Sequence, residues 1–320
     1  MKLLWLDLNS SYAHSSLALP ALHAQIADDT TIEWCIVSAT INENTGMVVS
    51  RIHKHRPDII AATNWLFNHE QLLHIISRAK ALLPHCCIVL GGPEFLGNNE
   101  AFLYKNKFVS GVFRGEGEEV FPQWLKVWNH SKETWKSITG LCYLDENGRY
   151  QDNGIARVMN FSQLVSPEKS CFFNWSKPFV QLETTRGCFN TCAFCVSGGE
   201  KPVRTIPLEA IRERLNDIHQ HGIKNVRVLD RTFNYNNKRA KELLDLFRQY
   251  PDICFHLEIH PALLSEELKQ ELSVLPKGVL HLEAGIQSLK ESVLPPYRKV
   301  IRRIGRIKIS LFTKEYGNAC

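Results

Sequence analysis

The sequence Glu183-Thr-Thr-Arg-Gly-Cys188-Phe-Asn-Thr-Cys192-Ala-Phe-Cys195 places three cysteines within eight residues, directly after a predicted strand. A loop this short can wrap three thiolates around one metal centre. Structural zinc sites usually close with four ligands arranged as two pairs, and no fourth Cys or His stands at matching spacing nearby. Iron–sulfur clusters also normally take four cysteines, so three cysteines leave one iron open for a non-protein ligand.

Around this loop, short apolar runs alternate with amphipathic segments. The expected strands are 179–183, 225–229, 254–259 and 279–283, and the expected helices are 208–219, 238–250 and 265–272. This alternation is typical of a (β/α) barrel, whose chemistry lies at the carboxyl ends of the strands. Asp230, Glu258 and Gln287 stand at such ends. The sequence therefore predicts a partial barrel with a polar rim.

The first part of the chain shows the same alternation. The expected strands are 2–8, 32–37, 58–63, 87–90 and 108–113, and the expected helices are 15–26, 46–55, 69–83 and 119–128. The strands are apolar on both faces, which predicts a parallel sheet covered by helices. We expect a doubly wound, flavodoxin-like or Rossmann-like domain with its ligand crevice at the carboxyl ends of the strands.

The predicted fold class is therefore α/β, with a doubly wound N-terminal domain followed by a partial (β/α) barrel. The expected segments are 1–130 for the first domain, 131–178 for a linker, 179–294 for the partial barrel and 295–320 for an atypical basic tail. Within the linker, Asp145-Glu-Asn-Gly148 stands between apolar runs and predicts a hairpin over residues 138–150.

The composition predicts a globular protein without a membrane partner. Its 320 residues, 44% hydrophobic and 10% aromatic, suffice for two cores. No stretch reaches the roughly 18 uncharged apolar residues that span a bilayer, and the first residues do not look like a secretory leader. Ten cysteines in such a chain favour reduced thiols over disulfides. We expect a cytoplasmic protein.

The net charge of +5 is a property of the tail. From Pro295 to Cys320 there are seven Lys or Arg and one Glu, a balance of +6 that leaves the remaining chain at −1. One interpretation of the tail is a basic amphipathic helix that binds nucleic acid or an anionic surface. In the other, its isoleucines bury against the open edge of the barrel.

The spacing C-x3-C-x2-C, with Phe194 before the third cysteine, resembles the signature of radical S-adenosylmethionine enzymes. The E-x-x-R-G lead-in resembles members with an N-terminal cobalamin-binding domain. The resemblance implies a [4Fe-4S] cluster on Cys188, Cys192 and Cys195 whose open iron binds S-adenosylmethionine, which one electron cleaves to methionine and a 5′-deoxyadenosyl radical. The alternative is three buried or zinc-bound cysteines.

The resemblance also implies further contacts to S-adenosylmethionine. The backbone of Phe194 is the candidate for the adenine, and Asp230, Glu258 and Gln287 are the candidates for the amine and ribose. The alternative for each of these three is a polar residue at the barrel rim whose hydrogen bonds are made within the protein. Ser-Gly-Gly-Glu200 echoes the Gly-Gly-Glu motif of the family but follows the cysteines directly, so that role is not transferred to Glu200.

In the first domain, Gly91-Gly92-Pro93 and Arg114-Gly-Glu-Gly-Glu118 resemble the cobalamin-binding domains of the same family. Gly91 and Gly92 would let the backbone approach a bulky ligand closely. The D-x-H-x-x-G motif that supplies a lower axial histidine is absent, and Asn-Ser-Ser-Tyr-Ala-His14 stands instead. A loop histidine such as His14 more often caps a helix or faces solvent than binds cobalt. Cobalamin binding without a histidine ligand and a lost cobalamin site therefore both stay open.

The resemblance covers about residues 1–290. It implies six barrel strands, and four precede Gln287. With the abrupt charge shift, this predicts a chain that is truncated or frame-shifted at its C-terminus.

The predicted function is radical S-adenosylmethionine chemistry, a methyl transfer or rearrangement assisted by cobalamin. This chemistry implies an electron donor such as flavodoxin or ferredoxin, whereas the substrate is not readable from the sequence. A rival interpretation is a non-catalytic iron–sulfur or metal-binding protein with a degenerate cobalamin-like domain. A zinc-binding interaction module is a third.

Overall fold

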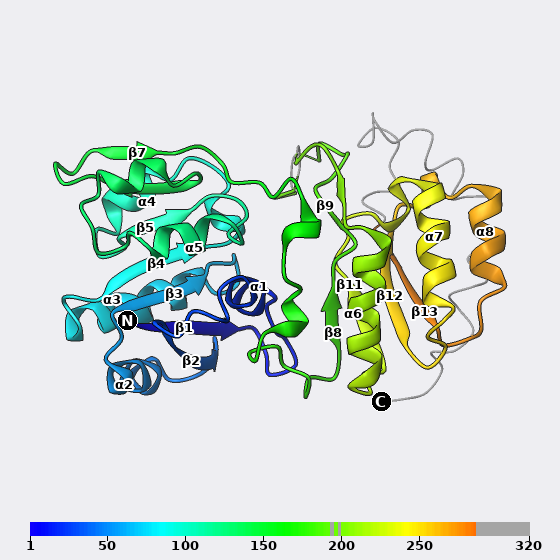
Figure 1. Cartoon of the computed structure of the whole chain (residues 1–320), viewed down its shortest axis with the longest axis horizontal. Helices are drawn as coiled ribbons and strands as arrows, with labels where there is room; N and C mark the ends of the chain where they lie inside the picture. The colour runs from blue at the N-terminus through cyan, green and yellow to red at the C-terminus, as the bar shows by residue number, and fades with distance from the viewer. Residues whose placement is uncertain (193–194, 198–199, 286–320) are drawn as a thin grey trace. The chain divides into compact units, whose positions relative to one another are not determined.

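The computed structural model describes residues 1–192, 195–197 and 200–285. The chain divides into two compact units, Met1–Pro178 and Phe179–Cys320. Each unit is built on its own main sheet (Figure 1). In the part of the chain that is described, no helix is long and apolar enough to cross a membrane.

The sheet of the first unit has the strand order β2-β1-β3-β4-β5-β6-β7. In chain order the strands are β1 (Lys2–Asn9), β2 (Glu33–Thr40), β3 (Ile59–Thr63), β4 (Cys87–Gly91), β5 (Gly111–Phe113), β6 (Leu141–Leu144) and β7 (Tyr150–Asp152). The first five pair in parallel, and β6 and β7 add an antiparallel edge. The order β2-β1-β3-β4-β5 is that of a flavodoxin-like sheet, with its switch point between β1 and β3.

Helices cover both faces of this sheet. They are α1 (Ala18–Ala24), α2 (Thr45–His55), α3 (His69–Leu82), α4 (Glu100–Lys105) and α5 (Val120–Leu125). Leu4 and Leu6 of β1 pack in one core with α2, α3 and α4, whereas Leu3 and Trp5 pack in a second core with α1 and α5. Because successive side chains of a strand point to opposite faces, one apolar run serves both cores.

The second unit has a parallel sheet with the order β13-β12-β11-β8. Its strands are β8 (Val180–Leu182), β11 (Asn225–Val228), β12 (Cys254–Ile259) and β13 (Leu280–Ala284), and its helices are α6 (Leu208–Gln220), α7 (Asn237–Phe247) and α8 (Glu266–Ser273). The helices lie along one face of the sheet (Figure 1). On that face Phe255 of β12 stacks on Phe247 of α7, with ring centroids 4.1 Å apart.

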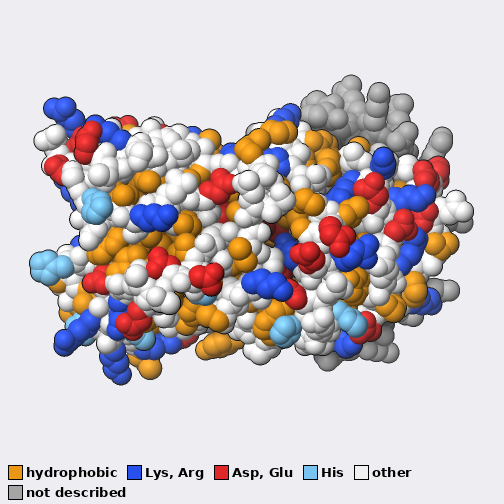
Figure 2. Space-filling model, viewed as in Figure 1, with side chains coloured by type: hydrophobic (Ala, Val, Ile, Leu, Met, Phe, Trp, Pro, Cys, Tyr) orange, Lys and Arg blue, Asp and Glu red, His pale blue; other side chains and the backbone are white. Residues whose placement is uncertain are grey.

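Charged side chains of both signs are interspersed on the drawn surface of the second unit (Figure 2). Among the described residues, Lys241 of α7 pairs with Glu267 of α8 over 2.9 Å, and Arg248 pairs with Glu271. An exposed pair such as Lys241–Glu267 contributes little to stability. This surface gives no sign of a basic patch, and the basic tail, residues 295–320, lies outside the described residues.

The structure confirms the predicted α/β class, with a doubly wound sheet followed by part of a (β/α) barrel. The hairpin that the sequence analysis placed in the linker pairs with β5, Val112 opposite Cys142, and so extends the first sheet. The helix expected from residue 15 begins only at Ala18, because the Ser16 hydroxyl accepts the Ala18 N–H and holds the chain in a turn. Helix α4 was not predicted, because six residues show little periodicity.

Candidate functional site

A small two-stranded ladder closes the base of the loop that holds the cysteines. The short strands β9 (Thr185–Arg186) and β10 (Arg204–Thr205) pair antiparallel, and the N–H of Ile206 donates to the carbonyl of Thr184 over 2.9 Å. Residues 187–203 form the loop between these strands, which we call the cysteine loop. The loop follows the carboxyl end of β8, which is where the barrel pattern predicts the chemistry to lie.

The two ends of the cysteine loop touch at a glycine. Gly187 has a φ of +94°, and a Cβ there would lie 2.5 Å from the carbonyl oxygen of Glu200. The N–H of Cys188 donates to the same oxygen over 3.0 Å. Only glycine permits this approach, because any side chain at position 187 would collide with the Glu200 carbonyl. This explains why glycine stands at the end of the E-x-x-R-G lead-in.

The Glu and Arg of the lead-in form an ion pair. The Arg186 Nη2 lies 2.8 Å from the Glu183 Oε2, and the two side chains are 15% and 21% exposed. The guanidinium of Arg214, on α6, donates to the backbone carbonyl of Glu183 over 3.3 Å. The lead-in, which directly precedes the first cysteine, is therefore held by an ion pair within itself and by a hydrogen bond from α6.

The three cysteines differ in exposure. Cys188 is buried, Cys192 is half-buried and Cys195 is exposed, and none forms a disulfide among the described residues. No group of three or more His, Cys, Asp or Glu side chains in the described ranges is arranged to hold a metal ion. Three thiols can bind three irons of a [4Fe-4S] cluster and leave the fourth iron open, and such a set commonly assembles only around its metal. Phe194 lies outside the described residues.

Asp230 follows β11 and is 1% exposed. Its Oδ1 accepts the backbone N–H of Thr184 over 2.8 Å and that of Thr185 over 2.9 Å, and its Oδ2 accepts the Thr184 hydroxyl. Burial raises the pKa of the Asp230 carboxyl, and these hydrogen bonds oppose the rise. The carboxylate thus binds the start of the lead-in.

Asn234 lies four residues further along the same rim and is 1% exposed. Its Oδ1 accepts the N–H of His260 over 2.7 Å, and its Nδ2 donates to the His260 carbonyl over 2.9 Å. The His260 ring in turn lies 6.4 Å from that of Phe189 in the cysteine loop. The end of β12 is therefore fixed to the same rim.

Glu258 of β12 points away from the helices, since Leu257 beside it is buried. Its side chain is 41% exposed, and its Oε1 lies 3.4 Å from the Arg227 Nη2. Arg227 also lies 3.8 Å from Glu283 of β13. This face of the sheet is charged, and Glu258 is accessible on it. Gln287 lies outside the described residues.

Gly91 is the last residue of β4 and Gly92 follows it, at the carboxyl edge of the first sheet. Gly92 has a φ of +111°, and a Cβ there would lie 2.5 Å from the carbonyl oxygen of Asn64. The N–H of Asn64 donates to the Gly91 carbonyl over 2.7 Å. The close approach that Gly92 permits is therefore made with the chain's own backbone after β3.

The switch point between β1 and β3 carries exposed apolar side chains on its two loops. Tyr12 is 77% exposed in the loop after β1, and Leu66 is 83% and Phe67 is 40% exposed in the loop after β3. The rings of His14 and Phe67 meet edge-on at 5.9 Å. The His14 Nδ1 lies 3.0 Å from the Asn9 Oδ1, so His14 is anchored to the end of β1. Such a surface suits a large ring ligand.

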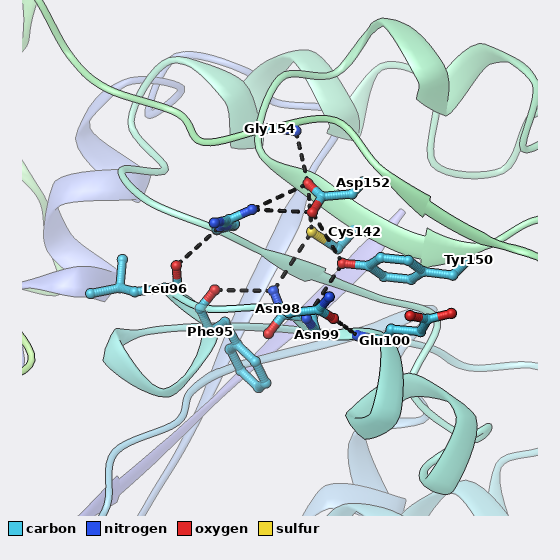
Figure 3. Close-up of polar contacts among 10 residues, drawn as sticks. Phe95, Leu96, Asn98, Asn99, Glu100, Cys142, Tyr150, Asp152 and Gly154 are labelled. Atoms are coloured by element: carbon cyan, nitrogen blue, oxygen red, sulfur yellow. Dashed lines mark hydrogen bonds and ion pairs between the residues drawn. The ribbon is translucent and has the colours of Figure 1, made fainter.

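A polar network fastens the β6–β7 hairpin to the loop that follows Gly92. Figure 3 shows Tyr150 and Asp152 of β7 turned toward that loop. Asp152 pairs with Arg114 over 3.1 Å, and the Arg114 Nε donates to the carbonyl of Leu96 over 3.0 Å. Burial is the main cause that raises the pKa of the Tyr150 hydroxyl. The hairpin thus braces the carboxyl edge of the first sheet.

The side chains that hold the loops in place were not predicted from the sequence. Thr184 and Asn234 are almost fully buried in the segments that follow β8 and β11, and their only sequence signal is that position. Tyr12 and Leu66 are exposed apolar residues, which are too common in loops to single out.

Comparison with known protein families finds two matches. The model of the B12 binding domain matches residues 8–125. The model of the Radical SAM superfamily matches residues 182–311 and thus covers the cysteine loop.

Curated relatives match part of the chain. An uncharacterised methyltransferase of Pyrococcus horikoshii is 29% identical over 201 residues, which are 60% of this chain and 43% of the relative. The hopanoid C-3 methylase of Methylococcus capsulatus is 26% identical over 180 residues, 52% of this chain and 34% of the relative. The chain therefore spans less than half the length of these relatives.

Two solved structures share the fold. The radical S-adenosylmethionine methyltransferase TsrM of Kitasatospora setae, with tryptophan and an S-adenosylmethionine analogue bound, superposes with a TM-score of 0.72 at 16% identity, over 92% of this chain and 60% of that one. The cobalamin-dependent enzyme OxsB, with aqua-cobalamin and S-adenosylmethionine bound, gives 0.73 at 17% identity, over 93% and 45%.

Proposed function

Because the chain is a radical S-adenosylmethionine protein with an N-terminal B12-binding domain, we propose that it is an enzyme of cobalamin-assisted methyl transfer. The proposal includes a [4Fe-4S] cluster, S-adenosylmethionine and cobalamin as cofactors. Relatives named as methyltransferases support methyl transfer over rearrangement.

The observation that carries the proposal is the cysteine loop. It holds three cysteines that form no disulfide, it starts at the carboxyl end of a barrel strand, and its ends are closed by β9, β10 and Gly187. A fixed base with three cysteines and no fourth in the motif leaves one coordination position for a ligand from outside the protein.

In this proposal Cys188, Cys192 and Cys195 hold the cluster. When bound, the cofactors supply a 5′-deoxyadenosyl radical and a carrier for the methyl group. Glu258 has an accessible carboxylate that can accept hydrogen bonds from the amine or ribose of S-adenosylmethionine. Phe194 and Gln287 remain predicted contacts.

Cobalamin is proposed to bind at the switch point of the first sheet. The exposed rings of Tyr12 and Phe67 and the side chain of Leu66 support this, because a corrin ring offers a broad apolar face. Gly91 and Gly92 lie on the same carboxyl edge and remain candidates for backbone contact. His14 is anchored at Asn9 and stays a candidate on the same loop.

The chemistry needs a reductant and a substrate. We propose a reductant of the flavodoxin or ferredoxin type and a cytoplasmic setting, which the free cysteines support. A nucleic-acid partner for the basic tail remains a prediction. The relatives are named as enzymes, so nothing among them favours a non-catalytic metal-binding protein.

The test is anaerobic reconstitution with iron and sulfide, reduction with dithionite and an assay for 5′-deoxyadenosine in the presence of S-adenosylmethionine. The wild type is expected to form 5′-deoxyadenosine and Cys192→Ala to form none. Cys254→Ala is the matched control, because Cys254 is a half-buried thiol of the same unit outside the motif. A cluster without 5′-deoxyadenosine would support the binding-protein alternative, and zinc in place of iron would support the zinc module.

A further inference from the structure

We propose that Asp230 is a positioning residue that fixes the cysteine loop relative to the barrel strands, rather than a contact to S-adenosylmethionine. This inference rests on the proposed function, because the cysteine loop is the proposed site of the cluster. It goes beyond the alternative that the sequence offered, a polar residue at the barrel rim, because it names the loop that Asp230 holds.

The geometry of the carboxylate supports the assignment. Oδ1 accepts the N–H groups of Thr184 and Thr185, and Oδ2 accepts the Thr184 hydroxyl, so both oxygens are engaged by the lead-in. The side chain is 1% exposed. A carboxylate that is enclosed in this way has no open face toward a ligand, whereas Glu258 on the neighbouring strand is 41% exposed.

The hydrogen bonds reach the cysteines through a short path. Thr185 belongs to β9, Gly187 follows β9, and Cys188 is the next residue. The carbonyl of Thr184 accepts the N–H of Ile206, just after β10, so both strands at the base of the loop are tied to Asp230. Hydrogen bonds to a buried carboxylate are stronger than neutral ones and costly to break.

Asn234 extends the same rim in the other direction. It makes two hydrogen bonds to the backbone of His260 at the end of β12, whereas Asp230 binds the end of β8. The segment from Asp230 to Asn234 therefore links the strand ends on both sides of β11. The base of the cysteine loop is thus held by Asp230 through the backbone of Thr184 and Thr185.

Three variants and one control test the role. Asp230→Ala removes all three hydrogen bonds. Asp230→Asn retains the three contacts in neutral form, because its Oδ1 can accept both N–H groups and its Nδ2 can donate to the Thr184 hydroxyl oxygen, which reverses the direction of that hydrogen bond. Thr184→Val removes only the hydroxyl. Asp252→Asn is the control, since Asp252 is an exposed carboxylate of the same unit that pairs with Lys224.

The first readout is hydrogen exchange of the backbone amides of residues 184–188 in the cluster-free protein. Asp230→Ala is expected to exchange roughly tenfold faster there, Asp252→Asn is expected to match the wild type, and Thr184→Val is expected to lie between these two. Asp230→Asn is expected to exchange only slightly faster than the wild type, because its neutral amide makes the same contacts with weaker hydrogen bonds. Unchanged exchange in Asp230→Ala would overturn the proposal. If Asp230→Ala does not fold, the comparison of Thr184→Val with Asp230→Asn decides in the same way.

The second readout is the rate at which a chelator removes iron from the reconstituted proteins. Asp230→Ala is expected to lose iron roughly tenfold faster, with rescue in Asp230→Asn. If Asp230→Ala keeps its cluster but S-adenosylmethionine no longer changes the spectrum of the reduced cluster, Asp230 contacts the cofactor and the proposal is wrong. A wild type that forms no cluster would refute the proposed function alone, because hydrogen exchange tests the positioning role without iron.

Discussion

The carboxyl edges of the two sheets are built differently. In the first unit, Gly92 and Asn64 pack backbone against backbone, and the loop after β3 also carries the exposed side chain of Leu66. In the second unit, the buried side chains of Asp230 and Asn234 hold the strand ends and the loops, and one of these loops contains the three cysteines. The first edge suits a large molecule that is bound by its shape. The second edge suits a small inorganic group that is coordinated by protein side chains.

The largest expected effect is on the second edge. Cys188→Ala, Cys192→Ala or Cys195→Ala should each abolish 5′-deoxyadenosine formation, because the cluster loses one of three protein ligands. Cys171→Ala removes an exposed thiol of the first unit and should leave the yield unchanged. Iron content and 5′-deoxyadenosine are measured together. Full activity in any of the three variants would remove that cysteine from the ligand set.

The next effect is on the stability of the first edge. Gly92→Ala should lower the free energy of unfolding by about 3 kcal/mol, because its φ is +111° and its Cβ would meet the Asn64 carbonyl. Gly148→Ala has a φ of +74° with open space around it and should cost about 1 kcal/mol. Urea unfolding followed by tryptophan fluorescence reports on the first unit, since all seven tryptophans precede residue 179. Equal losses would contradict the close-packing argument.

A smaller effect concerns pH. Burial lowers the pKa of His23, which is 7% exposed beside Trp34 and 2.9 Å from the Ser170 hydroxyl. The unfolded chain therefore binds the proton more readily, so the contribution of His23 is fully present above its ordinary pKa of 6.5 and is lost as the pH falls below it. His23→Gln should flatten this dependence of the urea midpoint between about pH 7 and 5. If the urea midpoint of wild type and variant changed equally with pH, the pH dependence would come from groups other than His23.

The smallest effect on stability is expected at the switch point. Leu66→Ser should change the free energy of unfolding by no more than about 0.5 kcal/mol, because Leu66 is 83% exposed. It should weaken hydroxocobalamin binding roughly tenfold if Leu66 covers the ligand. Val274→Ser, a 64% exposed apolar residue of the second unit, is the control. Titration by absorbance measures both, and equal affinities would move the cobalamin site away from this loop.

Much of the fold follows from the sequence, because apolar runs bounded by polar turns determine which segments form strands. β12 was predicted at its observed bounds, Cys254–Ile259, and most other strands differ by a few residues. The pairing of the β6–β7 hairpin with β5 did not follow, because a hairpin signal is local and does not say which sheet it joins.

The candidate site is less readable from the sequence. The cysteine spacing identifies the donor atoms, but the enclosure of Asp230 by Thr184 and Thr185 depends on contacts 45 and 46 residues apart. No local pattern distinguishes a polar residue that binds a ligand from one that binds the backbone. Exposure separates Asp230 from Glu258, and exposure is a property of the fold.

The most direct test of the central claim is the electron paramagnetic resonance spectrum of the reconstituted, reduced protein with and without S-adenosylmethionine. A cluster held by three cysteines has one open iron, so the spectrum should be that of a reduced [4Fe-4S] cluster and should change when S-adenosylmethionine is added. A cluster signal that S-adenosylmethionine leaves unchanged, or no cluster signal, would contradict the assignment of Cys188, Cys192 and Cys195 as the ligands of an open cluster.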